Sequence, residues 1–180
     1  GLTMFTEHRH ATGTQPGLTH AYGVQYAPDT NWTLGVNFEN GWVGAETLGA
    51  TRREAVALTA GYSSERLKYS GGLEYRKETS EFVQDPISAS GALFFNAIGT
   101  REGSYTVKEA YGEIRIPILK DLPFAEELSV ELAGRVSDYS SIGGTDQYRL
   151  NAEWAPVKDV RFRATQATAV RAPNIVELFA

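Results

Sequence analysis

The feature of this chain that most restricts its fold is a strict alternation of apolar and polar residues along short segments. In residues 32–38 every second side chain is apolar, and the positions between them hold Thr33, Gly35 and Asn37. A period of two places the apolar side chains on one face of a β-strand and the polar ones on the other. The same period recurs in about nine segments, each near the length of a tilted membrane strand. The sequence therefore predicts an all-β, antiparallel, up-and-down transmembrane barrel, or an open segment of a larger one.

The connections between these segments are of two kinds. Short ones are expected at Ala27–Asn31, Ser63–Glu65 and Pro156–Asp159, with a moderately short one at Leu119–Glu126. Longer ones, rich in Gly, Ser and Thr, are expected at Thr12–Gly17, Asn40–Thr51 and Lys77–Gly103. Outer-membrane barrels show this asymmetry, with short periplasmic turns and long extracellular loops. Pro117 and Pro156 cannot donate a ladder hydrogen bond, so both are expected at strand ends beside periplasmic turns.

Aromatic residues lie close to both kinds of connection. Those beside the short turns are Tyr26, Trp32, Tyr62 and Trp154, and those beside the long loops are Tyr75, Tyr105, Tyr139 and Tyr148. Amphipathic rings favour the headgroup zone of a membrane, so two aromatic girdles are expected. A water-soluble barrel or sandwich also alternates. It gives no reason for paired girdles, unequal loops, or a second face that carries charges of both signs.

Composition narrows the class of protein further. A formal net charge of −5 argues against nucleic acid as a partner, because phosphate binding needs a basic surface. The absence of cysteine excludes disulfides and thiolate metal sites. A run of about eighteen apolar residues, which a membrane-spanning helix needs, does not occur. No signal peptide and no plug domain are expected, so residues 1–180 are taken as a single barrel segment.

Several motifs resemble the barrel of TonB-dependent receptors. Gly71–Glu78 and Asp85–Phe94 look like a strand and loop of that family, Gly103–Pro117 like the next strand, Arg135–Ser140 like its Arg-x-Ser-x-Tyr-Ser strand end, and Glu153–Asp159 like its Trp-x-Pro turn. The most specific match is to Arg-Ala-Pro-x-Ile-x-Glu-Leu-Phe, and the residues that carry it are Arg171, Ala172, Pro173, Asn174, Glu177, Leu178 and Phe179. The resemblance covers roughly residues 71–180. The first seventy residues read as a generic outer-membrane barrel, so a junction between two barrel types near Gly71–Glu74 stays open.

The resemblance implies a function and partners. Receptors of this family take up ferric siderophores, cobalamin or carbohydrates across the outer membrane of Gram-negative bacteria, with a plug domain inside the barrel and energy delivered by TonB. The parent protein is therefore expected to contact outer-membrane lipid, a plug, TonB and a small-molecule ligand. This chain alone is expected to carry out no energy-coupled uptake. The alternative is a structural barrel or a small passive pore that transports nothing specific.

The polar face offers the first candidate site. The charged residues that share it are Glu113, Arg115, Glu131, Arg135, Arg149, Glu153, Arg161 and Arg163. Pairing of neighbouring strands would set opposite charges side by side as a ladder. The ladder could grip a plug, or it could simply solvate a wet wall, because any water-filled lumen needs polar residues.

Two smaller groups complete the candidates. Leu93, Phe94 and Phe95 form an apolar cluster in the longest predicted loop and could contact ligand or pack onto a neighbouring loop. His8, His10 and His20 could meet across one antiparallel pair and bind zinc or copper. No carboxylate or cysteine on that face completes the set, so an exposed rim of histidines is favoured and no metal site is predicted. All histidines lie in the first twenty residues and no Gly-x-Ser-x-Gly elbow occurs, so neither enzymatic activity nor a cofactor is expected.

Overall fold

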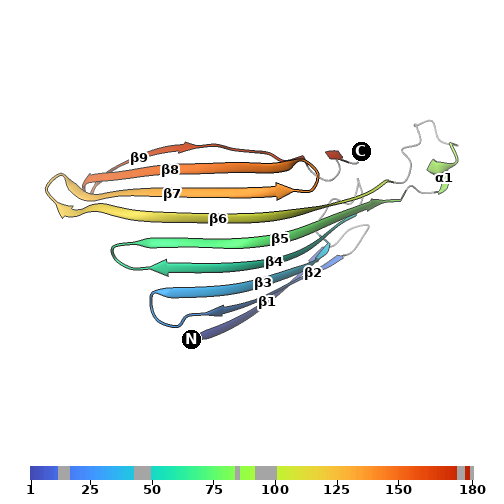
Figure 1. Ribbon diagram of the computed structural model, residues 1–180, viewed down its shortest axis with the longest axis horizontal. Helices are drawn as coiled ribbons and strands as arrows, with labels where there is room; N and C mark the ends of the chain where they lie inside the picture. The colour runs from blue at the N-terminus through green and yellow to red at the C-terminus, as the bar shows by residue number, and fades with distance from the viewer. Residues whose placement is uncertain (12–16, 43–49, 84–85, 92–100, 174–176, 179–180) are drawn as a thin grey trace.

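Nine strands follow one another in chain order across a single antiparallel sheet (Figure 1). The structure, a computed structural model, describes residues 1–11, 17–42, 50–83, 86–91, 101–173 and 177–178. The strands are β1 (Leu2–Ala11), β2 (Gly17–Tyr26), β3 (Trp32–Trp42), β4 (Ala50–Ser63), β5 (Lys68–Phe82), β6 (Arg101–Leu122), β7 (Ala125–Tyr139), β8 (Gly143–Val157) and β9 (Val160–Ala167). A four-residue helix, α1 (Pro86–Ala89), follows β5. The predicted antiparallel, up-and-down arrangement is confirmed. In the described ranges, no helix is long and apolar enough to span a membrane.

One face of the sheet, called the apolar face below, carries the apolar half of the alternation on every strand. One row of register partners crosses its centre and consists of Trp32, Tyr62, Tyr69, Ile114, Leu132 and Leu150. This face is not a protein core, because Leu58, Leu73 and Leu132 keep 50%, 58% and 46% of their surface exposed. Buried apolar side chains are few among the described residues, namely Tyr105, Val107, Ala125 and Ala155. A soluble sandwich would instead bury its apolar face against a second layer.

The aromatic residues of the apolar face form two bands that run obliquely to the strands. On β5, Tyr69 and Tyr75 mark the two limits, and on β8 the limits are Trp154 and Tyr148. The register links Tyr69 through β6 and β7 to Leu150, which lies four residues from Trp154. Four residues cover about 13 Å along a strand, and three strand spacings cover about 14 Å across the sheet. The bands therefore cross the strands at an angle that corresponds to a strand tilt of roughly 40°, as in membrane barrels.

The connections at one end of the sheet, called the short-turn end, are all brief (Figure 1, left). They comprise residues 27–31, 64–67, 123–124 and 158–159. The prediction of a loop at Leu119–Glu126 is wrong, because β6 runs to Leu122 and β7 starts at Ala125. Residues 123–124 suffice because Pro123 is followed by Phe124 at φ 60°, the arrangement of a type II turn.

The opposite end, called the long-loop end, has longer strands than predicted. β5 continues to Phe82 and β6 begins at Arg101, so both ends of the predicted loop Lys77–Gly103 are paired strand instead. β3 and β4 likewise extend into Asn40–Thr51. Paired strands form backbone hydrogen bonds with each other whether or not their side chains alternate in polarity. The strands can therefore continue beyond the residues whose alternation predicted them. The prediction that Tyr139 and Tyr148 lie beside a long loop is also wrong, since only residues 140–142 join β7 to β8.

Bulges explain where the two prolines lie. Pro117 pairs with Ser129 inside β6, so its predicted place beside a turn is wrong. The chain tolerates it there because β5 pairs with β6 only as far as Arg115, and a register shift follows between Pro117 and Leu119. Proline is accepted in sheets at edges and at bulges, where no ladder donor is needed. Pro156 lies at the end of β8 beside the turn, as predicted, and within a second register shift between Trp154 and Val157.

The first and last strands are the edges of the sheet. Within the described ranges no ladder joins β9 to β1, and every residue of β9 is exposed. Unpaired backbone groups at such an edge cannot remain bare in hydrocarbon. The sheet is therefore an open wall, which fits a segment of a larger barrel.

Candidate functional site

The polar face, opposite the apolar face, carries an ion-pair network toward the short-turn end. Its centre is Glu127, which accepts a hydrogen bond from Arg115 (Nη2 to Oε1, 3.0 Å) and pairs with Arg161 (Nη2 to Oε2, 3.4 Å). Glu153 pairs with Arg161 at 2.7 Å and with Arg163 at 3.5 Å. The three arginines that contact Glu127 on β7 or Glu153 on β8 come from β6 and β9, so the network spans four neighbouring strands. We call it the short-turn network.

A second group of contacts lies beside this network on the same strands. Glu131 accepts hydrogen bonds from Arg149 (2.6 Å) and from the amide of Asn151 (3.0 Å). Arg149 also lies 3.6 Å from Glu113, whose other oxygen accepts a hydrogen bond from the Ser70 hydroxyl. Opposite charges therefore lie side by side from β6 to β9, as the ladder hypothesis expected.

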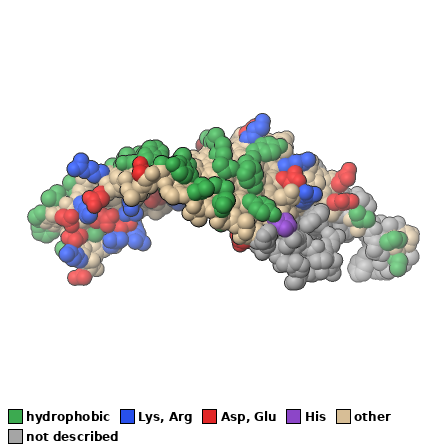
Figure 2. Space-filling view, turned by 90° about the horizontal axis from the view of Figure 1, so that it is seen from below, with side chains coloured by type: hydrophobic (Ala, Val, Ile, Leu, Met, Phe, Trp, Pro, Cys, Tyr) green, Lys and Arg blue, Asp and Glu red, His purple; other side chains and the backbone are tan. Residues whose placement is uncertain are grey.

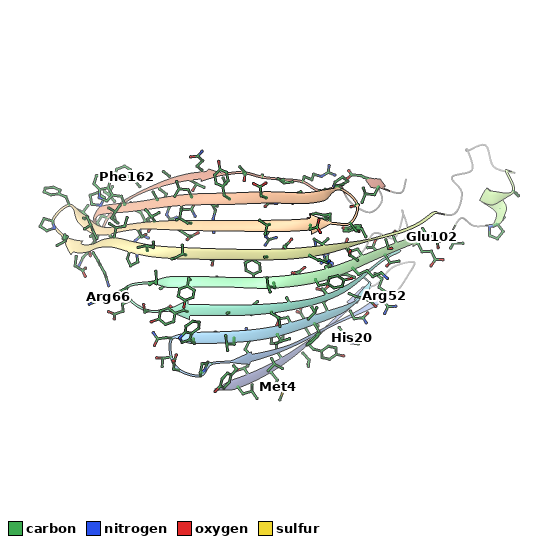
Figure 3. The ribbon with its side chains drawn as sticks, viewed as in Figure 1. Met4, His20, Arg52, Arg66, Glu102 and Phe162 are labelled. Carbon is green, nitrogen blue, oxygen red and sulfur yellow. The ribbon has the colours of Figure 1, made fainter. Side chains whose placement is uncertain are left out.

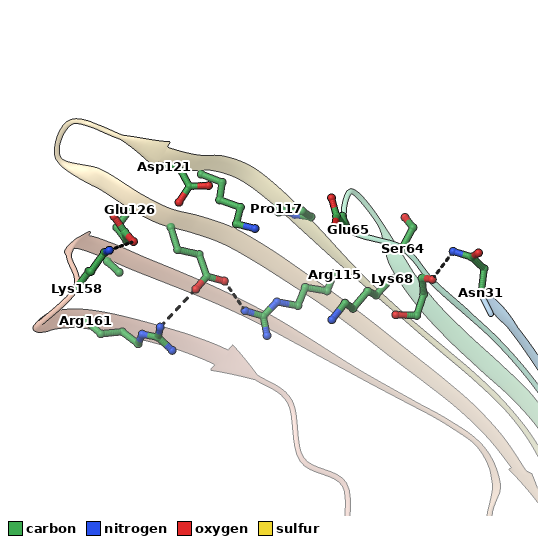
Figure 4. A pocket seen from close by; sticks show the side chains of 14 residues that line it. Asn31, Ser64, Glu65, Lys68, Arg115, Pro117, Asp121, Glu126, Lys158 and Arg161 are labelled. Atoms are coloured by element: carbon green, nitrogen blue, oxygen red, sulfur yellow. Dashed lines mark hydrogen bonds and ion pairs between the residues drawn. The ribbon is translucent and has the colours of Figure 1, made fainter.

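A groove opens beside the short-turn network at the end of the sheet (Figure 4). Its volume is about 840 Å³. Basic and acidic side chains both line it, and these are Lys68, Arg115, Lys120, Lys158, Arg161, Glu65, Asp121, Glu126 and Glu127. Most of the ion pairs here involve half-exposed side chains, such as Lys158 and Glu126 at 3.8 Å. Exposed pairs contribute little stability, so the groove is a solvated polar surface with near-balanced charge.

A second network lies on the polar face toward the long-loop end. Glu78 is 8% exposed and receives three partners: Arg53 at 3.0 Å, Arg76 at 3.2 Å, and the Tyr105 hydroxyl, which donates a hydrogen bond of 2.6 Å. Arg76 also pairs with Glu74 at 2.6 Å. A buried carboxylate is retained only when its charge is paired and its oxygens are hydrogen-bonded, and both conditions hold here. We call this group the Glu78 network.

Glu109, also 8% exposed, forms a separate pair of contacts on β6 and β7. It accepts a hydrogen bond from the Ser137 hydroxyl (2.9 Å) and pairs with Arg135 (3.1 Å). The Arg135 guanidinium lies 5.6 Å from the centre of the Tyr111 ring, a cation–π contact. The Tyr111 ring in turn covers Gly72, where an added Cβ would come within 2.7 Å of the Tyr111 hydroxyl. Gly72 therefore permits the ring to lie flat on the sheet.

The segment after β9 folds back onto the polar face. Leu178 packs against a small apolar cluster of Tyr105 and Val107, together with Tyr139. Within the same segment Arg171 and Glu177 form an ion pair. Three residues of the receptor motif therefore make contacts: Arg171 and Glu177 with each other, and Leu178 with β6. Ala172 and Pro173 are half-buried, while Asn174 and Phe179 lie outside the described residues.

The predicted charged residues divide into three groups. Four of the eight named from sequence belong to the short-turn network, namely Arg115, Glu153, Arg161 and Arg163. Glu113, Glu131 and Arg149 form a second group beside it, and Arg135 pairs with Glu109. Sequence reasoning missed the residues that connect or bury these charges, chiefly Glu127, Glu78 and Glu109. Glu127 shares the alternation of the polar face with Glu131. It was not included because the loop wrongly predicted at Leu119–Glu126 placed the end of the strand next to it.

The other candidates receive less support from geometry. Register pairs His8 with His20 and His10 with Leu18, so the histidines approach along one hairpin, as the sequence suggested. No group of three potential metal ligands occurs among the described residues. Leu93, Phe94 and Phe95 lie outside the described residues.

Unsatisfied polar atoms also mark the polar face. The amide oxygens Asn37 Oδ1 and Asn151 Oδ1 are buried, yet neither accepts a hydrogen bond from the described residues. Buried amide oxygens normally have a partner. These two oxygens are exceptions to that rule in the described part of the chain.

Comparison with known proteins adds one finding. A family model described as TonB dependent receptor-like, beta-barrel matches residues 4–180. The match runs across Gly71, where a junction between two barrel types had stayed open, and so includes the first strands as well as the last. Neither the curated proteins nor the solved structures contain a match to this chain.

Proposed function

Because this chain belongs to the family of TonB-dependent receptor β-barrels, we propose that it forms part of the wall of an outer-membrane receptor for nutrient uptake. The observation that carries this proposal is the contrast between the faces. The apolar face is exposed and bears two oblique aromatic bands, while the polar face bears ion pairs from β5 to β9. Lipid suits the first face and a wet or protein-filled lumen suits the second.

The polar face would then contact the plug domain of the parent receptor. Half-exposed guanidinium groups such as Arg149 and Arg161 offer further donors after their ion pairs are made. A plug that meets this wall through polar contacts could shift during transport at lower cost than one packed through a hydrophobic core, because its polar groups can exchange partners with water.

Ligand contact is assigned to the loops at the long-loop end. The apolar residues Leu93, Phe94 and Phe95 are the candidates, on sequence grounds. The ligand would belong to one of the classes that the family resemblance implies, namely ferric siderophores, cobalamin or carbohydrates. TonB would supply the energy through the plug.

A topological test addresses the membrane first. In the parent receptor folded into lipid vesicles, a spin label at Leu150 should report contact with lipid-soluble quencher, and one at Asn151 contact with water-soluble quencher. Adjacent residues of a strand point to opposite faces, so the two labels control each other. Reversed accessibility would contradict the assignment of the faces.

An uptake test addresses transport. Cells that express the parent receptor would be given radiolabelled ferrichrome, cyanocobalamin or maltodextrin, with and without TonB. We expect saturable uptake of one class that disappears without TonB and falls in the L93A/F94A/F95A variant. Correct topology with no TonB-dependent uptake of any class would instead favour a structural barrel or passive pore.

A further inference from the structure

The apolar face ends in charged residues toward the long-loop end, and these residues follow the tilt of the strands. The first charged residue beyond the apolar stretch on each of five neighbouring strands is Glu54 on β4, Lys77 on β5, Lys108 on β6, Asp138 on β7 and Asp146 on β8. In register, Glu54 pairs with Lys77, Lys108 with Asp138, and Asp146 with Val136. The boundary therefore steps along the strands in the same direction as the aromatic bands.

The size of those steps places the five charges near one level. From β4 to β8 the boundary moves by four residues along the strands, because Asp146 lies four register rows below the Glu54–Lys77 row. At a tilt of roughly 40°, the five residues come within about 4 Å of a common plane. Tyr75 and Tyr148 lie just below that plane, on the apolar side. A line of charges above a line of aromatic rings is what a membrane surface requires of a barrel wall.

Two lysines on this line are neighbours without an acidic partner in contact. Lys77 faces Thr106 and Lys108 faces Tyr75 across the β5–β6 ladder, so the lysines are diagonal neighbours on one face. Both are exposed, and neither forms an ion pair with any residue in the described ranges. By contrast, Glu54 is paired with Arg52 at 3.1 Å, and Arg52 also donates a hydrogen bond to Asn40. Figure 3 shows Arg52 toward the long-loop end, far from Arg66 at the short-turn end.

We infer that Lys77 and Lys108, above the Tyr75 ring, form a binding site for the phosphate group of a membrane lipid headgroup. Two ammonium groups side by side repel each other. A phosphate placed between them attracts both, so the electrostatic interaction becomes favourable. The exposed apolar face directly below, which includes Leu73 and Ala110, would receive the acyl chains of the same lipid. A lipid with a phosphate headgroup therefore matches both the lysine pair and the apolar face below it. A free phosphate matches only the lysine pair.

Two acidic residues oppose this site, each as the register partner of one lysine: Glu54 of Lys77 and Asp138 of Lys108. Glu54 is paired with Arg52, whereas no ion pair joins Asp138 to Lys108. The Asp138 carboxylate lowers the local positive potential, so the site is expected to be of moderate affinity. Removal of the Asp138 charge should strengthen phosphate binding.

The test rests on the proposed membrane placement and is designed to separate the two ideas. The parent receptor would be reconstituted in phosphatidylcholine nanodiscs that contain diphosphoryl lipid A or the same lipid without its phosphates. Native mass spectrometry would count the retained lipid, and quenching of tryptophan fluorescence by brominated phosphatidylcholine would report whether the apolar face meets acyl chains. If the tryptophan fluorescence is not quenched, both the proposed membrane placement and the proposed lipid site are contradicted.

The expected results are specific to phosphate and to position. Wild-type receptor should retain the phosphorylated lipid in preference to the dephosphorylated one. A lysine at a charged membrane surface contributes a factor of about five, so K77Q/K108Q should weaken retention by roughly thirtyfold. K77R/K108R should retain the lipid, and D138N should bind it more tightly. K120Q/K158Q, with the same change of charge at the short-turn end, should behave as wild type.

The contrary results are equally defined. Quenching with no preference for phosphorylated lipid, or with equal retention by K77Q/K108Q and wild type, would overturn the site while leaving the membrane placement intact. Binding of inorganic phosphate as tight as that of the lipid would also overturn it, because the acyl chains would then contribute nothing.

Discussion

The two faces of this sheet are built from alternate residues of the same strands, yet they follow different rules. On the apolar face, side chains such as Leu58, Leu73 and Leu132 are about half exposed and have no specific partner to satisfy. On the polar face, Glu78, Glu109 and Ser137 are buried and each is held by named donors or acceptors. Figure 2 shows hydrophobic side chains gathered over the middle of the molecule and charged ones concentrated at the short-turn end.

From this difference we expect the tolerance of a position to substitution to depend on which face of the sheet it occupies, and not on which strand it belongs to. A substitution on the apolar face needs only a side chain that is compatible with hydrocarbon. A substitution on the polar face must preserve a specific ion pair or hydrogen bond, because a charge that loses its partner is left partly desolvated. Each variant below is compared with a control on the other face, on another strand or at a more exposed position.

The largest effect is expected from a charge placed at the centre of the apolar face. L132R sets a guanidinium between Ile114 and Leu150. Arginine near the midplane of a bilayer destabilises a membrane barrel by about 2–4 kcal/mol. Equilibrium unfolding of the parent receptor from lipid vesicles by guanidinium chloride measures this change. T165R, on the exposed polar face of β9, is the control and should cost less than about 1 kcal/mol.

Equal costs for L132R and T165R would contradict the comparison. That result would mean that both faces meet the same medium.

A smaller loss is expected from the Glu78 network. E78Q removes the charge that Arg53, Arg76 and the Tyr105 hydroxyl share. Because Glu78 is buried while Arg53 remains partly exposed, we expect destabilisation by about 2 kcal/mol rather than the larger loss of a fully buried pair. Unfolding in vesicles again gives the value. E126Q, which breaks the exposed pair with Lys158, is the control and should change stability by less than about 1 kcal/mol.

Should E126Q prove as costly as E78Q, burial would not be what distinguishes the two networks.

The sequence predicted the fold well because alternation survives wherever a strand has one apolar and one polar face. Trp32, Tyr62, Tyr69 and Leu150 fall in one register row, and their faces follow from parity alone. The prediction failed where both faces of a strand are polar. β5 and β6 continue as a hairpin through residues whose pattern no longer alternates, and sequence alone read them as loop.

The candidate site was only partly predictable for a different reason. The alternation of side chains along each strand places Arg115, Glu131 and Arg149 on one face. It does not determine which of these charges form ion pairs. Pairing depends on register, and one residue at a bulge changes the register of everything beyond it. Glu127 lies beside such a bulge and is opposite Lys120 only because β6 contains an extra residue between Pro117 and Leu119. Its ion pairs are with Arg115 and Arg161 on other strands, and parity alone does not predict them.

A further prediction concerns the receptor motif after β9. L178A removes the side chain that packs on Tyr105 and Val107. Leu178 is half-buried, so the loss should be about 1–1.5 kcal/mol, below the range for a fully buried leucine. V170A, at an exposed position of the same segment, is the control and should be close to neutral. If both variants unfold as wild type does, the contact of Leu178 with the polar face contributes nothing to stability.

The smallest effect is expected from deletion of one residue. Pro117 pairs with Ser129 and Leu119 with Leu128, so Ile118 is the extra residue of the bulge. Its deletion leaves Leu119 opposite Leu128 and Lys120 opposite Glu127, and no side chain changes face. We therefore expect stability to change by less than about 0.5 kcal/mol, comparable to a surface substitution. Deletion of Leu132 is the contrasting variant, because β7 has no bulge there to absorb it. One part of β7 would then turn its polar residues toward lipid, and folding in vesicles should fail. Equal tolerance of the two deletions would show that the faces do not differ in what they contact, and so would remove the distinction on which the other predictions depend.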